Sequence, residues 1–458
     1  MEKLISDKNK FTGRLITIGL PIFLQLLFMS LLNFIDGFMI GQLVDSSGSA
    51  DNAISAIGLA NQLFIVLEVF LAAISSGAAV FASQAWGKKD TSNIKSVLGI
   101  SISISCMISF LFAVLAICFP EKLVNLYPAG DSVKILTIQY LTIIGFSHIP
   151  MGITFSYSSV LRSIENTKLP LMISVLAICI NTVLNYFLIF GKFGFPELGV
   201  RGAAIATVIA RCVEAFLLVV IPYFQKSPIA GKIKEIFNFN FSFAKKYIKI
   251  VLPIIAGEGG WVVGEIVYNY MYFHLGESAF AAVGAFYNIN AIFFLAFVGL
   301  AESSTIMIGN RIGADERKKA FDYSVKFVIL AAAGAIIIGS TIFLSKEFFL
   351  SFFKLSSAAL YNCNNLLIIF SFVLILKAVN VLLINGIFRA GGDTLFSFKM
   401  DFFLVWFVGI PIGLISVFIL HLPVYFVFLL INIEELLKTI LCLFRFFSKK
   451  WLKNLTQR

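Results

Sequence analysis

Charged residues are scarce in this 458-residue sequence, in which Asp, Glu, Lys and Arg together make up 13%. Soluble domains carry roughly 25%. Hydrophobic residues make up 59% of the chain. A sequence with so few polar side chains cannot cover a water-soluble surface, so a soluble enzyme is excluded first.

Histidine and cysteine are also rare and scattered. The three histidines lie far apart, and the six cysteines include no CxxC pair. This spacing is not typical of a metal centre. We therefore expect no catalytic residues, no cofactor and no metal other than a candidate Na⁺ at Asp36. The net charge of +11 does not indicate nucleic acid, because the charges lie in short segments between apolar runs, as membrane topology requires.

Twelve apolar runs are long enough to cross a bilayer. Backbone polar groups in lipid must be satisfied internally, so we expect helices, and the lack of strict alternation excludes a barrel of short strands. The sequence therefore predicts an all-α polytopic membrane protein with twelve transmembrane helices. The predicted spans are 15–44, 53–85, 94–119, 133–161, 169–190, 199–224, 247–275, 278–307, 321–344, 361–388, 401–420 and 423–447.

Lysine and arginine sort strongly between the two sides of these spans. One side, which includes both chain ends, holds 27 of them and the other side holds six. The positive-inside rule then predicts a multi-pass protein of the cytoplasmic (inner) membrane with both termini in the cytoplasm.

The two halves of the chain repeat one another. Pro21 in GLPIFLQ and Pro253 in VLPIIAG are 232 residues apart. Gly87 and Gly313, which follow spans 2 and 8, are 226 apart, and Arg162 and Arg389 are 227 apart. Repeats of an even number of spans are typical of transporters. We predict an N-lobe at 1–225, an inter-lobe cytoplasmic loop at 226–246 and a C-lobe at 247–458, which together form two pseudo-symmetric six-helix lobes.

Polar side chains gather at one depth in the first half. Asp36 is a carboxylate inside span 1, and the amides Asn181 and Asn185 and the hydroxyl of Thr207 lie at a similar depth in spans 5 and 6. Buried charges are costly and usually functional. We expect these four residues to bind a cation or a proton. Two further polar residues share the helical face of Asp36, namely Asn33 and Gln25. We expect them to contribute to substrate binding and coupling, together with four charged residues of the second half: Glu258, Glu265, Lys377 and Asp401.

The second half carries a different set of polar residues. Glu258 and Glu265 belong to a polar and aromatic stripe on span 7, and Lys377 lies in span 10, where it is a candidate to neutralise Glu258. Asp401 begins span 11, where it either caps the helix or takes part in coupling. Arg211 with Glu214, and Glu435 with Lys438, have the i, i+3 spacing of structural ion pairs.

An ordered set of strings resembles the multidrug and toxic compound extrusion (MATE) transporters, in their bacterial efflux branch. These strings are GLPIFLQLLFMSLLNFIDGFMIGQL, QAWGKKD, LRSIENTKLPLMIS, INTVLNYFLIFG, GVRGAAIATVIAR, GEGGW, IGNRIGADE, FRAGGDT and EELLKTILCLFRFFSKKWLKNLT. The resemblance implies two lobes around a central cleft and alternating access. It also implies export of organic cations and drugs against inward Na⁺ or H⁺.

The resemblance also implies roles for individual residues. Asp36, Asn181 and Thr207 match the N-lobe cation site, and Glu258 matches the acid of span 7. Asn185 departs from members that have an acid there. The expected partners are membrane lipid and small organic cations, with no nucleic acid, and we expect a monomer. The alternative is a flippase for a lipid-linked saccharide, which would need a cavity lined by Arg and Lys.

Overall fold

The computed structural model describes the backbone of residues 2–42 and 50–456, with side chains for all of these except 2–10, 33, 34 and 50. Every regular element in these two ranges is helical. Asn33 lies within helix α1, but its side chain is outside the described part, so its predicted role stays a prediction. Predicted span 1 ends at 44, also outside the described residues.

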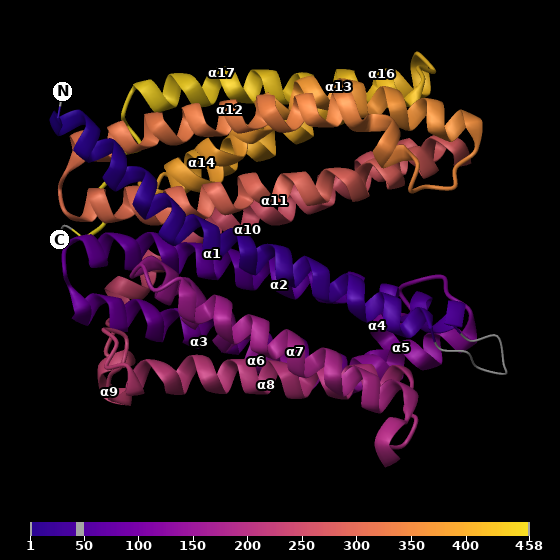
Figure 1. Cartoon of the computed structure of the whole chain (residues 1–458), viewed down its shortest axis with the longest axis horizontal. Helices are drawn as coiled ribbons and strands as arrows, with labels where there is room; N and C mark the ends of the chain where they lie inside the picture. The colour runs from indigo at the N-terminus through magenta and orange to yellow at the C-terminus, as the bar shows by residue number, and fades with distance from the viewer. Residues whose placement is uncertain (1, 43–49, 457–458) are drawn as a thin grey trace. The chain divides into compact units, whose positions relative to one another are not determined.

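The helices of the first half follow the predicted spans closely (Figure 1). They are α1 (Glu2–Gly41), α2 (Ala50–Gly87), α3 (Thr91–Cys118), α4 (Pro120–Val124), α5 (Asp131–Ile144), η1 (Gly145–Ser147), α6 (His148–Ser163), α7 (Lys168–Phe190), η2 (Lys192–Gly194), α8 (Val200–Phe224) and α9 (Ile233–Ile236). Predicted span 4 is continuous through α5, the short 3₁₀ segment η1 and α6.

The helices of the second half are less regular. They are α10 (Phe241–His274), α11 (Glu277–Gly313), α12 (Arg317–Leu350), α13 (Ser357–Val381), η3 (Leu382–Phe388), α14 (Thr394–Leu404), η4 (Val405–Gly409), α15 (Ile410–Leu414), η5 (Ile415–Ile419), α16 (Val424–Ile431) and α17 (Ile433–Phe447). The segments η3, η4 and η5 are π-helical. Such turns insert an extra residue into a helix and often mark functional positions.

Eleven helices in the described part are long and apolar enough to cross a membrane. The twelfth predicted span is present as α16 and α17, which are separated at Asn432. Each piece is shorter than the roughly 20 residues that a continuous crossing needs. The chain is therefore an all-α polytopic membrane protein whose last span is broken.

The chain clusters into two compact units. Unit 1 contains the residues up to Phe23 and those from Lys246 onward, and unit 2 is Leu24–Lys245. Helix α1 thus begins in unit 1 and continues in unit 2. Our predicted lobes differ from this division because the chain up to Phe23 groups with the second half, and 226–245 groups with the first.

Unit 2 is built from paired helices, in which α7 packs against α8 and α3 packs against α2 and α6. Gly202 permits one of these contacts, because a Cβ there would lie 2.4 Å from the carbonyl oxygen of Leu188. At one end of the unit, small and branched side chains such as Ala60, Val124 and Ala204 fill the core. This packing sets the close spacing between α7 and α8, which carry the candidate site residues.

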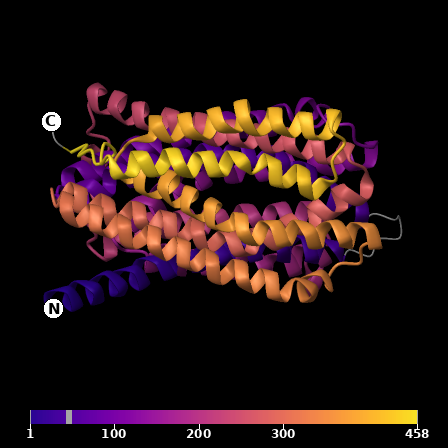
Figure 2. The same ribbon diagram turned by 90° about the horizontal axis from the view of Figure 1, so that it is seen from above.

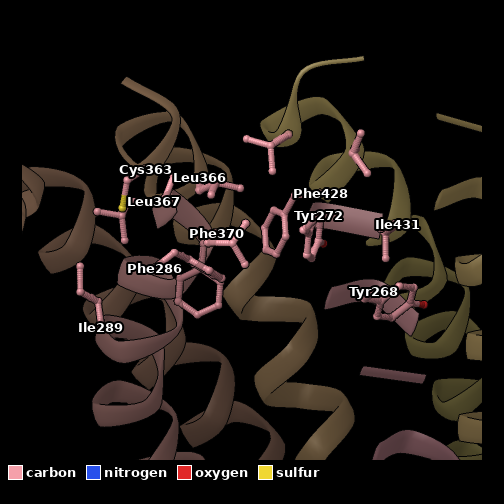
Figure 3. Packing of buried hydrophobic residues seen from close by; sticks show 14 of the residues in the cluster. Tyr268, Tyr272, Phe286, Ile289, Cys363, Leu366, Leu367, Phe370, Phe428 and Ile431 are labelled. Carbon is pink, nitrogen blue, oxygen red and sulfur yellow. The ribbon is translucent and has the colours of Figure 1, made fainter. Parts of the chain in front are cut away.

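Unit 1 has a core of aromatic rings. Phe286 of α11 lies edge-on to both Phe370 of α13 and Phe428 of α16, with ring centroids 5.1 Å apart in each pair (Figure 3). Tyr268 and Tyr272 of α10 are also buried there. Helices α12 and α13 run side by side along their length (Figures 1 and 2). Edge-to-face ring pairs add to the packing energy and fix helix positions.

Candidate functional site

Four predicted polar residues of unit 2 meet in one cluster. The side-chain amide nitrogen of Asn185 donates to Asp36 Oδ1 at 2.7 Å and to Asn181 Oδ1 at 3.0 Å. Asn181 Nδ2 lies 3.1 Å from Thr207 Oγ1, and that hydroxyl donates to the Ala203 carbonyl at 3.0 Å. The cluster therefore joins α1, α7 and α8 through one carboxylate, two amides and a hydroxyl.

The amide of Asn181 satisfies its neighbours when its nitrogen faces Asp36. The nitrogen then donates to Asp36 Oδ1 at 3.0 Å, and the oxygen accepts from Thr207 Oγ1 at 3.1 Å. That arrangement gives an ionised Asp36 two amide donors. With the oxygen facing Asp36 instead, two oxygens would lie close together.

One oxygen in the cluster lacks a hydrogen bond. The Oδ1 atom of Asn185 is buried and has no partner among the described residues, although buried polar atoms are nearly always paired. Together with Asp36, Asn181 and Thr207, it gives a set of oxygen donors from three helices. Hard cations prefer oxygen ligands, so these residues suit Na⁺, and the carboxylate suits a proton.

A cavity of about 50 Å³ with both polar and apolar walls adjoins this cluster inside unit 2. Asn181 and Thr207 form part of its wall, together with Glu68 of α2 and Arg211 of α8. The volume exceeds the roughly 30 Å³ that one water occupies in the liquid. Arg211 Nη1 is paired with Glu214 Oε2 at 3.0 Å, which confirms the predicted i, i+3 pair.

Gln25, which shares the helical face of Asp36, lies in a separate polar contact. It is buried and donates to Ser174 Oγ at 3.0 Å, and the Ser174 hydroxyl donates to Glu214 at 2.8 Å. Arg162 Nη1 donates to Gln25 Oε1 at 3.2 Å. Gln25 thus links α1 to α6 and α7, two to three helical turns from the Asp36 cluster.

In unit 1, Glu258 pairs with Arg389, the residue that corresponds to Arg162 in the sequence repeat. Arg389 Nη2 lies 2.6 Å from Glu258 Oε1 and 2.7 Å from Asn385 Oδ1. Lys377, the predicted neutralising residue, instead lies near Glu265, Glu434 and Glu435, close enough for electrostatic interaction. Arg389 follows the π-helical segment η3. The extra residue of that segment changes which side of the helix Arg389 faces, and regular helical spacing does not predict this change.

Asp401 and Glu265 are both engaged with side chains of other helices. Lys438 Nζ lies 3.1 Å from Asp401 Oδ1 and 3.5 Å from Glu435 Oε1, so the predicted Glu435–Lys438 pair is confirmed and has a third member. Asp401 lies in the interior of α14, which begins at Thr394, and therefore does not cap the helix. The Tyr287 hydroxyl donates to Glu265 Oε2 at 3.0 Å.

Sequence reasoning missed several residues of these networks. Glu434 is 5% exposed and accepts a hydrogen bond from the Tyr268 hydroxyl at 3.0 Å. Its neighbour Glu435 drew attention through its i, i+3 spacing to Lys438, and the i, i+4 spacing of Glu434 to the same lysine was overlooked. Ser174 was missed because a lone serine in an apolar helix carries little signal. The bonds from Tyr268 to Glu434 and from Gln25 to Ser174 join separate helices, so spacing along one helix does not reveal them.

Known proteins resemble the chain over nearly its whole length. The sequence profile of the MatE family matches residues 21–187 and again 253–415. The uncharacterized transporter YisQ of Bacillus subtilis is 24% identical over 446 residues, which are 97% of this chain and 96% of that protein. The probable multidrug resistance protein NorM of Thermotoga maritima is 25% identical over 407 residues, 88% of this chain and 86% of the relative.

A crystal structure of MATE in complex with MaL6 superposes with a TM-score of 0.85 at 17% identity, covering 95% of this chain and 96% of that chain. At this identity the likeness concerns the fold. The profile, by contrast, covers more than half of the chain and matches once in each half. This polytopic membrane protein therefore belongs to the MatE family, the multidrug and toxic compound extrusion transporters.

Proposed function

We propose that the protein is a secondary active antiporter that exports lipophilic organic cations and drugs in exchange for inward Na⁺ or H⁺. The observation that carries this proposal is the Asp36 cluster. A single carboxylate is held there by neutral amides, next to a buried Asn185 oxygen that has no hydrogen-bond partner among the described residues. The resemblance to NorM of Thermotoga maritima, a probable multidrug resistance protein, supports the class of substrate.

The mechanism follows from what binding does to Asp36. An ionised Asp36 accepts hydrogen bonds from the α7 amides. A bound proton or Na⁺ neutralises the carboxylate and weakens these charge-assisted bonds, so the outer part of α1 is released from α7. Helix α1 contains Pro21, which lacks a backbone N–H and weakens the helix at that turn. We infer that α1 bends near Pro21 when Asp36 is neutralised and that this bend favours release of substrate outward.

The driving force depends on the charge of the substrate. A tenfold ion gradient supplies about 1.4 kcal/mol. Exchange of one inward cation for one outward monovalent cation moves no net charge, so the membrane potential adds nothing. A neutral substrate would also gain about 2.3 kcal/mol per 100 mV for each ion. Clamping the potential with a potassium ionophore therefore separates the two cases.

The flippase alternative finds less support. A lipid-linked pyrophosphate needs cationic side chains with unneutralised charge in a cavity. The cavity of unit 2 contains Arg211, but its guanidinium is paired with Glu214, and Glu68 lies on the same wall. In unit 1, Arg389 is paired with Glu258. These carboxylates favour a cationic cargo, so we keep organic cations as the proposed substrate class.

Several further points belong to this proposal. We propose that the protein lies in the cytoplasmic membrane with both termini in the cytoplasm, that it works as a monomer without cofactor or nucleic acid, and that it is not an enzyme. We also propose that Glu258, Glu265, Lys377 and Asp401 contribute to substrate binding and coupling in unit 1. Their contacts to other helices would let a bound cation shift those helices.

The test is ethidium efflux from proteoliposomes, with a Na⁺ gradient and a pH gradient imposed separately. The wild type should respond to one gradient, and Asp36→Asn should reduce that response to the level of empty vesicles. Asp51→Asn, at an exposed position in the first turn of α2, should behave as the wild type. Gradient-driven efflux by Asp36→Asn at the wild-type rate would refute the assignment.

A further inference from the structure

An apolar groove opens on the outside of unit 2, away from the Asp36 cluster. It has a volume of about 530 Å³ and is formed by α3, α6, α8 and the loop helix α9. Its walls are apolar or aromatic, and representative residues are Ile102, Ile153, Val220 and Ile236. Walls this apolar offer no hydrogen bonds to water, so the groove suits a hydrocarbon ligand.

The groove has the depth of one bilayer leaflet. Ile102 lies eleven residues after the start of α3 at Thr91, and Ile153 lies ten residues before the end of α6 at Ser163. At 1.5 Å per residue, the two are about 15–17 Å from that end of the helices. Half of the hydrocarbon core is about 15 Å thick. The groove thus extends along the helices for about the thickness of one leaflet, a length that suits a single acyl chain.

The loop wall of the groove is firmly attached to the helices. Ser96 of α3 donates to the Asn238 carbonyl at 3.1 Å, and the Tyr223 hydroxyl donates to the Gly231 carbonyl at 2.8 Å. Gly99 allows α9 to approach closely, because a Cβ there would lie 2.0 Å from the Ile236 carbonyl oxygen. These contacts hold α9 beside α3 and keep the groove open.

The loop segment beside the groove carries excess positive charge. Lys226, Lys232 and Lys234 are exposed in this segment, and Lys232 and Lys234 flank the lining residue Ile233. The acid of this segment, Glu235, is bound by Lys95 at 2.7 Å, and that hydrogen bond lowers the pKa of Glu235 below its usual range. Lys232 also acts on Glu235, but the four lysines outnumber this single acid, so a net positive charge is left to meet an anion.

We propose that this groove binds an anionic phospholipid from the leaflet on the lysine-rich side. One acyl chain lies in the groove, and the phosphate lies between Lys226, Lys232 and Lys234. Basic side chains next to an apolar surface suit such a lipid, since each adds about fivefold to its affinity. This site is separate from the transport site and does not depend on the antiport mechanism.

Native mass spectrometry of the full-length protein in detergent, titrated with phosphatidylglycerol or phosphatidylcholine, tests the proposal. The wild type should retain phosphatidylglycerol in preference to phosphatidylcholine. Val220→Trp fills the groove and should weaken binding of both lipids at least tenfold. Phe216→Trp, one turn away on the same helix at an exposed position, is the matched control and should bind as the wild type.

A charge variant tests the headgroup separately and avoids any packing defect. Lys232→Gln with Lys234→Gln should reduce the phosphatidylglycerol affinity about 25-fold, which is fivefold for each lysine, and leave phosphatidylcholine binding unchanged. Lys134→Gln with Lys192→Gln, at the opposite end of the unit, should have no effect. Equal lipid retention by wild type, Val220→Trp and the double lysine variant would overturn the proposal, whatever the outcome of the efflux assay.

Discussion

The two units hold their buried carboxylates in different ways. In unit 2, Asp36 is contacted by the neutral amides of Asn185 and Asn181. In unit 1, Asp401 and Glu435 share the ammonium group of Lys438. The first carboxylate is held by uncharged donors, whereas the other two are neutralised by a charge built into the protein.

This difference suggests that Asp36 exchanges ions, whereas the carboxylates bound to Lys438 stabilise the structure. Asp36 has no salt-bridge partner among the described residues, and Arg211 acts on it only from a longer distance, so a mobile cation or proton can bind and leave. A carboxylate bound to a buried lysine already has its counter-charge, and removing that lysine leaves two acids exposed to a low-dielectric interior. We therefore expect changes at the Asp36 cluster to affect transport, and changes at the Lys438 network to affect stability.

The largest expected effect comes from removing the shared lysine. Lys438→Met should destabilise the protein by about 3–5 kcal/mol, because Asp401 and Glu435 lose their counter-charge. Asp36→Asn should change stability by less than about 1 kcal/mol, since it keeps the shape and removes an uncompensated charge. Thermal unfolding followed by tryptophan fluorescence measures both.

Lys450→Met, at an exposed position in the tail, is the control for the loss of a lysine and should unfold as the wild type. The comparison between the units would be broken if Lys438→Met and Asp36→Asn destabilised the protein equally.

Effects of intermediate size are expected from two asparagines, one in each unit, that each donate a hydrogen bond to a buried carboxylate. Asn185 donates to Asp36, and Asn380 of α13 donates to Glu435 Oε2 at 2.6 Å. Hydrogen bonds to charged groups contribute about 1.5–3 kcal/mol. Asn185→Ala should shift the apparent affinity for the coupling ion about tenfold with little change in unfolding temperature. Asn380→Ala should lower the unfolding temperature and leave the ion affinity of the folded protein within about twofold.

Ion-concentration dependence of efflux and thermal unfolding, measured on the same preparations, distinguish these outcomes. A reversed pattern, with Asn380→Ala shifting ion affinity and Asn185→Ala only stability, would place the exchange site in unit 1.

The smallest effect is expected from an ion pair outside the membrane. Hydrogen bonds from Lys319 and Arg311 hold the pKa of Glu316 below its usual range. A lowered folded-state pKa means that this stabilisation is present above the unfolded value of 4.5 and is lost as pH falls through the folded value. Exposed pairs contribute less than about 1 kcal/mol. Glu316→Gln should therefore lower stability slightly at pH 7 and by less at pH 3.

Denaturant unfolding at the two pH values measures the change in unfolding free energy caused by Glu316→Gln. That change is the reference against which the effects at the buried ion pairs are compared. An effect at pH 7 as large as that of Lys438→Met would mean that burial is not what separates the networks.

Much of the candidate cluster in unit 2 could be predicted because its residues lie on regular helices. Asp36, Asn181, Asn185 and Thr207 share a depth that simple residue counting finds, and the structure brings all four into contact. The partners of Glu258 and Asp401 could not be predicted in this way. Arg389 follows a π-helical segment, and Lys438 lies on a helix that begins after a break at Asn432. Both irregularities change which faces meet.

The sequence by itself determined the membrane class, the helical spans and the duplication. The reason is that backbone N–H and C=O groups in lipid must be hydrogen-bonded within the protein, and a helix achieves this within each span. Only the tertiary structure decided which polar groups meet. Gln25 contacts Ser174, the last span is divided into α16 and α17, and an oxygen of Asn185 has no hydrogen-bond partner in the described part of the chain. These outcomes depend on how helices far apart in the sequence pack, which periodicity along one helix cannot specify.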